Sequence, residues 1–95
     1  MSKRRFILVI LNSKNHIEAS KVTKILDRAP DWIEFVPNNW LVWTSLSATR
    51  WYSRLKPLLG SGDNLFICEV NIHDRSGFMP KSFWDFLRSK TAEEK

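Results

Sequence analysis

The sequence is poor in cysteine and glycine and has no long apolar run. Cys68 is the only cysteine, and the 95 residues include three glycines. An intrachain disulfide is therefore excluded, and the glycines do not form a phosphate-binding loop of the Walker or dinucleotide type. His16 and His73 lie far apart without companion cysteines, so we predict no metal site. No segment approaches the roughly 20 apolar residues that span a bilayer. With a lone thiol and no export signal, we expect a soluble cytoplasmic protein without a membrane association.

Aromatic residues are abundant by contrast. The chain has five Trp and six Phe, and 43% of its residues are hydrophobic. Each large aromatic side chain buries about 150–250 Å², so a short chain can still form a stable core. A length of 95 residues predicts a single domain, residues 1–95, with one core.

The charge balance is basic. Fifteen Lys and Arg against ten Asp and Glu give a formal net charge of +5. This surplus favours an anionic partner such as RNA or DNA, although proteins without an anionic partner often carry a similar charge.

Apolar periodicity predicts four strands and three helices. The expected strands are residues 6–11, 32–36, 40–44 and 64–70, and the expected helices are residues 18–28, 47–59 and 80–90. Pro30 ends the first helix, Pro57 loosens the last turn of the second, and Pro80 suits the first turn of the third. Ser47 is a suitable N-cap. The tail, residues 91–95, is expected to be frayed.

This order, β-α-β-β-α-β followed by a helix, predicts an α+β fold of the ferredoxin-like type with an antiparallel sheet. Right-handed crossovers place the first two helices on one face of that sheet. The opposite face is also apolar, so the third helix or a second copy of the chain must cover it. We therefore expect a homodimer, with either cover or both in place.

Several short segments carry a family resemblance. They are NWLVWT at 39–44, LSA at 46–48, LKPL at 55–58, DNLFICEV at 63–70 and FWDFL at 83–87. In these segments the chain resembles the SinR-family proteins, small bacterial relatives of the CRISPR-associated adaptation subunit and of virulence-associated protein D. The resemblance extends over roughly residues 5–88 and implies a ferredoxin-like, usually dimeric protein. Some distant relatives cut RNA or DNA.

Asn12 is where the chain departs from that pattern. In the nuclease relatives, a metal-binding acid follows the first strand, at the place that we align with Asn12. A neutral amide removes one full negative charge from such a site, and divalent cations prefer charged oxygen ligands. We therefore favour a protein that is not an enzyme and has no cofactor. A nuclease using Mg or Mn is the alternative, with Asn12 and His16 as its candidate residues. His16 follows the same strand and is a candidate general base, although loop histidines usually have no chemical role.

Basic residues form clearer clusters than the catalytic candidates. The candidate nucleic-acid-binding residues are Lys3, Arg4, Arg5, Lys21, Lys24, Arg28, Arg50 and Arg54. Residues three and four apart share one face of a helix, so two of these clusters form stripes. Such stripes either bind phosphates, with little sequence preference, or are ordinary solvated surfaces.

The favoured hypothesis is a small non-catalytic nucleic-acid-binding or adaptor protein of bacterial or phage type. Two alternatives stay open: a metal-dependent endoribonuclease or endonuclease, and a module that binds or inhibits a protein partner. An exposed aromatic patch would favour the protein partner, and a basic helix face would favour the other two.

Overall fold

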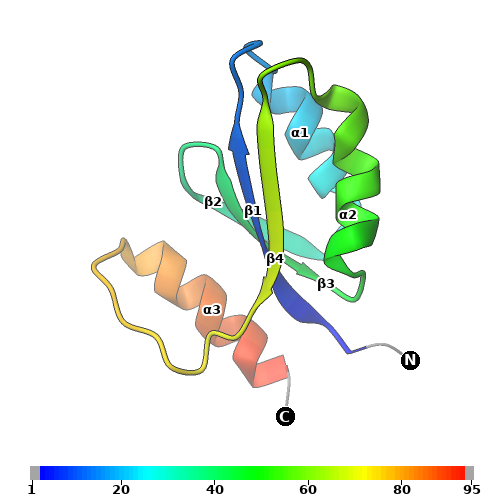
Figure 1. Cartoon of the computed structure of the whole chain (residues 1–95). Helices are drawn as coiled ribbons and strands as arrows, with labels where there is room; N and C mark the ends of the chain where they lie inside the picture. The colour runs from blue at the N-terminus through cyan, green and yellow to red at the C-terminus, as the bar shows by residue number, and fades with distance from the viewer. Residues whose placement is uncertain (1–2, 94–95) are drawn as a thin grey trace.

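The computed structural model describes residues 3–93, and it contains one four-stranded sheet in the order β2-β3-β1-β4 (Figure 1). The strands are β1 (Arg5–Asn12), β2 (Asp31–Val36), β3 (Asn39–Thr44) and β4 (Asn64–Val70). All neighbouring strands are antiparallel, with β1 and β3 at the centre. The predicted ferredoxin-like arrangement is confirmed.

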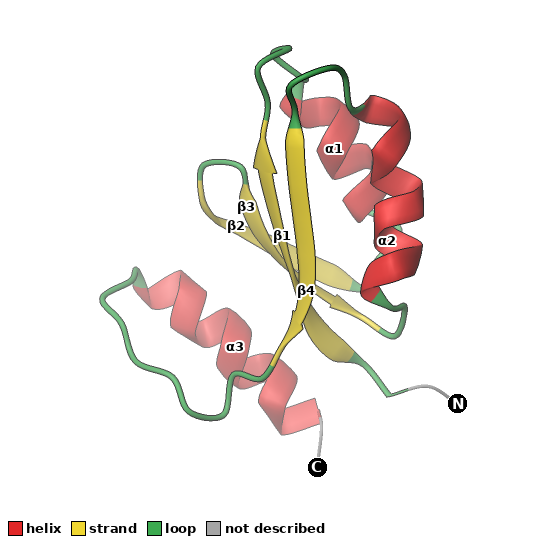
Figure 2. Cartoon of the chain, in the orientation of Figure 1, coloured by secondary structure: helices red, strands yellow, loops and turns green. Residues whose placement is uncertain are grey.

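Helices α1 (Ala19–Leu26) and α2 (Ala48–Leu55) cover one face of the sheet (Figure 2). Ser47 caps α2, since its hydroxyl accepts a hydrogen bond from the Arg50 backbone N–H at 3.3 Å. A short 3-10 helix, η1 (Lys56–Leu58), follows α2 directly. Pro57 lacks the N–H that a further α-helical turn requires, which confirms the expected loosening.

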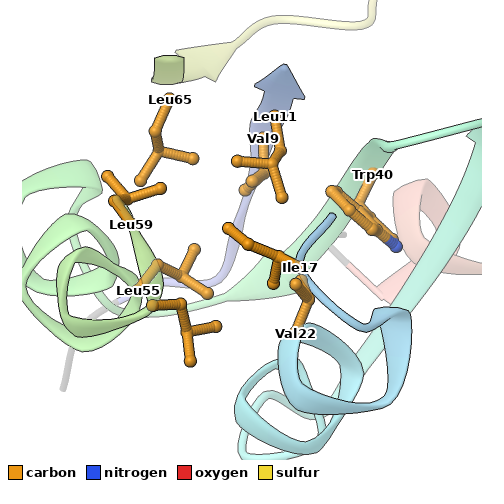
Figure 3. Close-up of a pocket in the computed structure, with 9 residues that line it drawn as sticks. Val9, Leu11, Ile17, Val22, Trp40, Leu55, Leu59 and Leu65 are labelled. Carbon is orange, nitrogen blue, oxygen red and sulfur yellow. The ribbon is translucent and has the colours of Figure 1, made fainter. Parts of the chain in front are cut away.

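The main core lies between this helix layer and the sheet. Its buried members include Ile7, Val9, Trp40 and Trp51. The Trp51 indole N–H donates to the hydroxyl of buried Thr44 at 3.2 Å. A space of about 10 Å³ remains between the layers, with only apolar side chains around it (Figure 3). It is too small for a ligand and offers no polar partner to a water molecule.

Helix α3 (Lys81–Glu93) packs against the opposite face of the sheet. Its Leu87 is buried with Phe6, Leu41 and Trp43 in a second core cluster. The rings of Phe6 and Trp43 lie 4.8 Å apart between centroids. The C-terminal helix therefore provides one of the two expected covers. Phe66 on β4 belongs to this same face by strand alternation but is 58% exposed, so the β4 side stays open.

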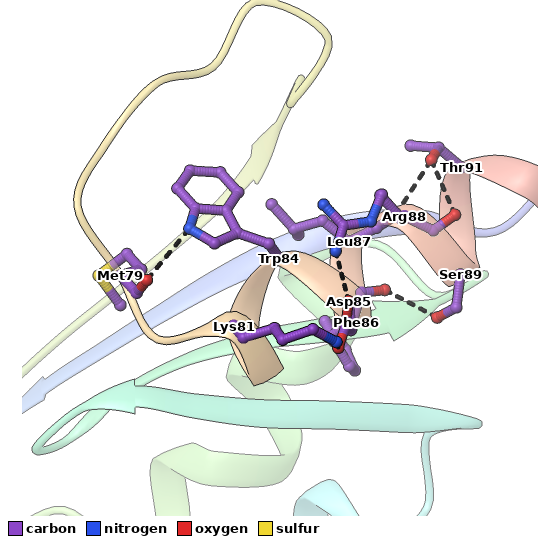
Figure 4. Close-up of polar contacts among 9 residues, drawn as sticks. All are labelled: Met79, Lys81, Trp84, Asp85, Phe86, Leu87, Arg88, Ser89 and Thr91. Carbon is purple, nitrogen blue, oxygen red and sulfur yellow. Dashed lines mark hydrogen bonds and ion pairs between the residues drawn. The ribbon is translucent and has the colours of Figure 1, made fainter.

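Helix α3 extends three residues beyond its predicted end at Lys90. The Thr91 hydroxyl bonds to the Leu87 and Arg88 carbonyl oxygens at 3.2 and 3.0 Å (Figure 4). Lys90 also forms an ion pair with Asp31 on β2 at 2.8 Å, which fixes the last turns to the sheet. Residues 94 and 95 of the predicted frayed tail lie outside the described residues. Within residues 3–93, no helix is long and apolar enough to cross a membrane.

Candidate nucleic-acid interface

Lys21 lies beside the chain that follows α2. It lines a hollow of about 430 Å³ together with Leu58 and Gly60. The Asn15 side-chain amide, just before α1, donates to the Ser61 carbonyl oxygen at 2.8 Å. The start of α1 therefore neighbours the end of α2, so the two helices run antiparallel, side by side on the sheet (Figure 1).

The rest of the α1 cluster continues along the flank that begins with Lys21. Lys24 follows it by three residues on the same side of the helix. Arg28 lies in the turn after Leu26, because α1 ends two residues before its predicted end. Asp27 marks the other side, since its carboxylate accepts a hydrogen bond from the Trp32 indole N–H on β2 at 2.9 Å. The basic flank of α1 is thus directed toward α2 and solvent, away from the β2 edge.

The α2 cluster faces the opposite way. Thr49 and Tyr52 lie beside β4, where they line a hollow with Phe66. Arg50 and Arg54 are one turn apart, and residues two apart on a helix, such as 50 and 52, point to nearly opposite sides. Arg50 and Arg54 therefore lie on the flank of α2 that faces α1.

Five basic side chains accordingly border the strip of surface between the antiparallel helices, with Arg28 coming from the turn after α1. We call it the basic groove, and its residues are Lys21, Lys24, Arg28, Arg50 and Arg54. Four of them are exposed, and the fifth, Arg54, is half-buried with its guanidinium carbon 4.9 Å from the centroid of the Trp51 ring.

Ion pairing distinguishes these five residues from Arg5, Lys81, Arg88 and Lys90, although not from every other basic residue. Among residues 3–93, none of the five groove cations is within ion-pair distance of a carboxylate. Elsewhere, Arg5 pairs with Glu69 at 3.4 Å, and Asp85 pairs with both Lys81 and Arg88 (Figure 4). Within the described residues, no short ion pair therefore neutralises these five cations, although Glu18 lines the same hollow as Lys21.

The N-terminal cluster lies at one end of the groove. Arg5 pairs in register with Thr44, the last residue of β3, shortly before α2 begins. Lys3 and Arg4 precede it and are exposed. Since Arg5 is already paired with Glu69, this cluster is a secondary extension of the groove.

Asn12 and His16, the candidate residues of a nuclease, lie on different sides of the molecule. Asn12 is the exposed last residue of β1, opposite Asn64. Leu11 belongs to the core beneath α1 and α2, so Asn12 points to the other face of the sheet. His16, in a left-handed conformation at φ 53°, lines the same hollow as Lys21. No cluster of three or more His, Cys, Asp or Glu side chains suited to a metal occurs within the described part of the chain.

Asp63 is a structural residue that the sequence did not reveal. One carboxylate oxygen accepts from the backbone N–H groups of Lys14 and Asn15, at 2.7 and 3.2 Å, and from the Ser13 hydroxyl at 3.1 Å. The other accepts from the Gly60 N–H at 2.8 Å. These hydrogen bonds, the Gly60 one foremost, lower the pKa of Asp63 to about 2. Asp63 thereby joins the loops before α1 and after α2 at the end of the groove.

No known protein family, curated protein or solved structure matches this chain. The resemblance to the SinR family therefore stays a prediction. The function is inferred below from the arrangement of the charged side chains and the two sheet faces.

Proposed function

We propose that this protein binds nucleic acid without cleaving it, through the basic groove between α1 and α2. One observation carries the proposal. Four of the groove cations lie on facing helix flanks and Arg28 lies just after α1. Within residues 3–93 none of the five has a carboxylate at ion-pair distance, whereas Arg5, Lys81, Arg88 and Lys90 are ion-paired. Unpaired cations in a row favour a polyanionic ligand, because binding releases the counterions condensed on it.

The expected contacts are to phosphates. Arginine binds phosphate oxygens with two parallel hydrogen bonds, and lysine contributes a point charge. Such contacts position a strand or duplex and confer little sequence preference. The aromatic rings beneath α3 do not provide a base-stacking surface, because Phe6 and Trp43 are 2% exposed; Phe66, at the β4 side of that face, is the exposed exception.

A role as a binding or adaptor protein in the bacterial or phage cytoplasm agrees with the resemblance to SinR-family proteins. Cleavage with Mg or Mn is the alternative. It is less well supported, because the residue aligned with the metal-binding acid is a neutral asparagine on the face opposite to the basic groove.

Fluorescence anisotropy with labelled single-stranded and duplex probes tests the proposal. If all five groove cations contact phosphates, log K on duplex DNA should fall with log salt at a slope of about −4.5. Between 50 and 200 mM salt, this slope corresponds to roughly a 500-fold loss of affinity. The triple variant Lys21→Gln, Lys24→Gln, Arg28→Gln removes three cations, so its slope should be about −1.8.

A second triple variant provides the matched control. Arg75→Gln, Lys81→Gln, Arg88→Gln removes the same three positive charges from exposed positions on α3 and the loop before it. The ion pairs that it disrupts are exposed and contribute little to stability. This control should keep the wild-type slope. Equal slopes for the two variants would show that only net charge matters, and undetectable binding at 50 mM salt to either probe would reject the proposal.

A further inference from the structure

The two edges of the sheet are protected to very different degrees. On the β2 edge, the register with β3 shifts between Glu34 and Val36. The strand also carries two carboxylates, one of which pairs with Lys90. Bulges and charges of this kind prevent an edge strand from pairing with another chain.

The β4 edge has no bulge, and it carries a single charged residue. All seven residues of β4 continue an unbroken antiparallel register with β1. The strand contains no Lys or Pro, and its only charged residue, Glu69, is paired with Arg5 of the same chain. A regular, mostly apolar edge presents unpaired N–H and C=O groups to a further strand.

An uncharged hollow adjoins this edge. It has a volume of about 340 Å³, lies between α2 and β4, and is lined by Ala48, Thr49, Tyr52, Leu65, Phe66 and Ile67. Phe66 is 58% exposed and Tyr52 is 42% exposed. Large apolar side chains around an open strand edge favour a partner that adds both a strand and apolar side chains.

We propose that this partner is a second copy of the chain, whose β4 pairs antiparallel with β4 around Ile67. This register uses the full strand, and it places Phe66 opposite the partner's Cys68. The charges also fit, since Glu69 stands opposite the partner's Leu65 and no like charges meet. Side chains of each copy fill the hollow of the other.

The pairing determines where the basic grooves lie. Two antiparallel edge strands are related by a two-fold axis perpendicular to their common sheet, so both helix layers come to the same face. Each α2 lies beside the partner's α2, and the two basic grooves open on one side. The dimer therefore offers a nucleic acid two grooves at once. This last step rests on the proposed function, whereas the pairing itself does not.

Light scattering after size exclusion, without nucleic acid, tests the pairing. The wild type at tens of micromolar should have about twice the 11.2 kDa chain mass. Phe66→Glu should be a monomer, because it places two carboxylates beside the two-fold axis. Phe78→Glu, at a fully exposed loop position away from β4, makes the same charge change and should stay a dimer. Circular dichroism verifies that each variant is folded.

The single cysteine provides a second readout in the unmodified protein. In the proposed register, Cys68 and the partner's Cys68 are diagonal neighbours with Cα atoms about 7–8 Å apart. A bismaleimide with a spacer of about that length should link two wild-type chains and should not link Phe66→Glu chains. A monomeric wild type, or a dimer that neither links through Cys68 nor responds to Phe66→Glu, would overturn the pairing.

The two proposals can fail separately. A linked dimer that binds neither RNA nor DNA keeps the interface and removes the nucleic-acid function. A monomer that binds with the predicted salt slope keeps the nucleic-acid function and removes the interface.

Discussion

Leu87→Ala tests whether α3 covers the second sheet face in solution. Leu87 is 2% exposed and packs with Phe6, Leu41 and Trp43. Its removal takes away the transfer free energy of the side chain and leaves a cavity between rigid aromatic rings. Leu→Ala substitutions in such sites cost about 2–5 kcal/mol, and we expect about 3 kcal/mol here. For a domain of this size, that loss lowers Tm by roughly 12–24 °C.

Urea unfolding followed by tryptophan fluorescence measures this loss, with thermal unfolding as a second probe. Ser82→Ala is the control, because Ser82 lies on the same helix and is exposed; it should change the free energy of unfolding by less than about 0.5 kcal/mol. A Leu87→Ala loss below about 1 kcal/mol would show that α3 is not docked on the sheet. The aromatic face would then be open to the bases of a nucleic acid, and binding would not be limited to the basic groove as proposed.

Three further predictions concern single positions. The pKa of Asp63 falls from 3.8 to about 2 on folding, so its stabilising effect is present above about pH 4 and is lost as the pH falls toward 2. Asp63→Asn should therefore flatten the decline of Tm in that range. An unchanged decline would contradict the role of the Asp63 hydrogen bonds. Ser47→Ala should lower the free energy of unfolding by about 1 kcal/mol, measured in urea, because the Arg50 N–H loses its cap. Wild type and Asn12→Ala should show no Mg- or Mn-dependent cleavage of RNA or DNA. Asn12→Asp should gain metal affinity, measured by calorimetry, without gaining cleavage. Wild-type cleavage that Asn12→Ala abolishes would identify an enzyme.

Local sequence signals predicted the helices and strands well, because the start and end of most of these elements depend on residues that are close together in the chain. The bounds of β4 coincide with the predicted segment 64–70, where a glycine-rich loop precedes an apolar run. Pro57 and Ser47 acted at the positions expected of them. The end of α3 was predicted too early, because Lys90 is held by Asp31, some sixty residues away in the chain.

Only part of the candidate site could be predicted, because the placement of one helix beside another depends on residues that are far apart in the chain. Spacing predicted that Lys21, Lys24 and Arg28 form one stripe and that Arg50 and Arg54 form another, although α1 ends at Leu26, before Arg28. It did not show that the two stripes face each other, since this depends on which flank of each helix packs beside the neighbouring strand. The Asp63 network was missed as well, because its donors come from two loops that meet only in the folded chain.

The position of Asn12 links the binding proposal to the predicted absence of cleavage. Strand alternation directs this side chain to the face that α3 shares, whereas all five groove cations lie in the layer of α1 and α2. A nucleic acid held in the basic groove keeps its phosphates on the far side of the sheet from residue 12. Restoring a carboxylate there returns the charge that a divalent cation requires, yet it leaves that cation away from the phosphodiester that it would have to activate. Binding through this groove and hydrolysis at the end of β1 are therefore separate properties, and retention of one does not require the other.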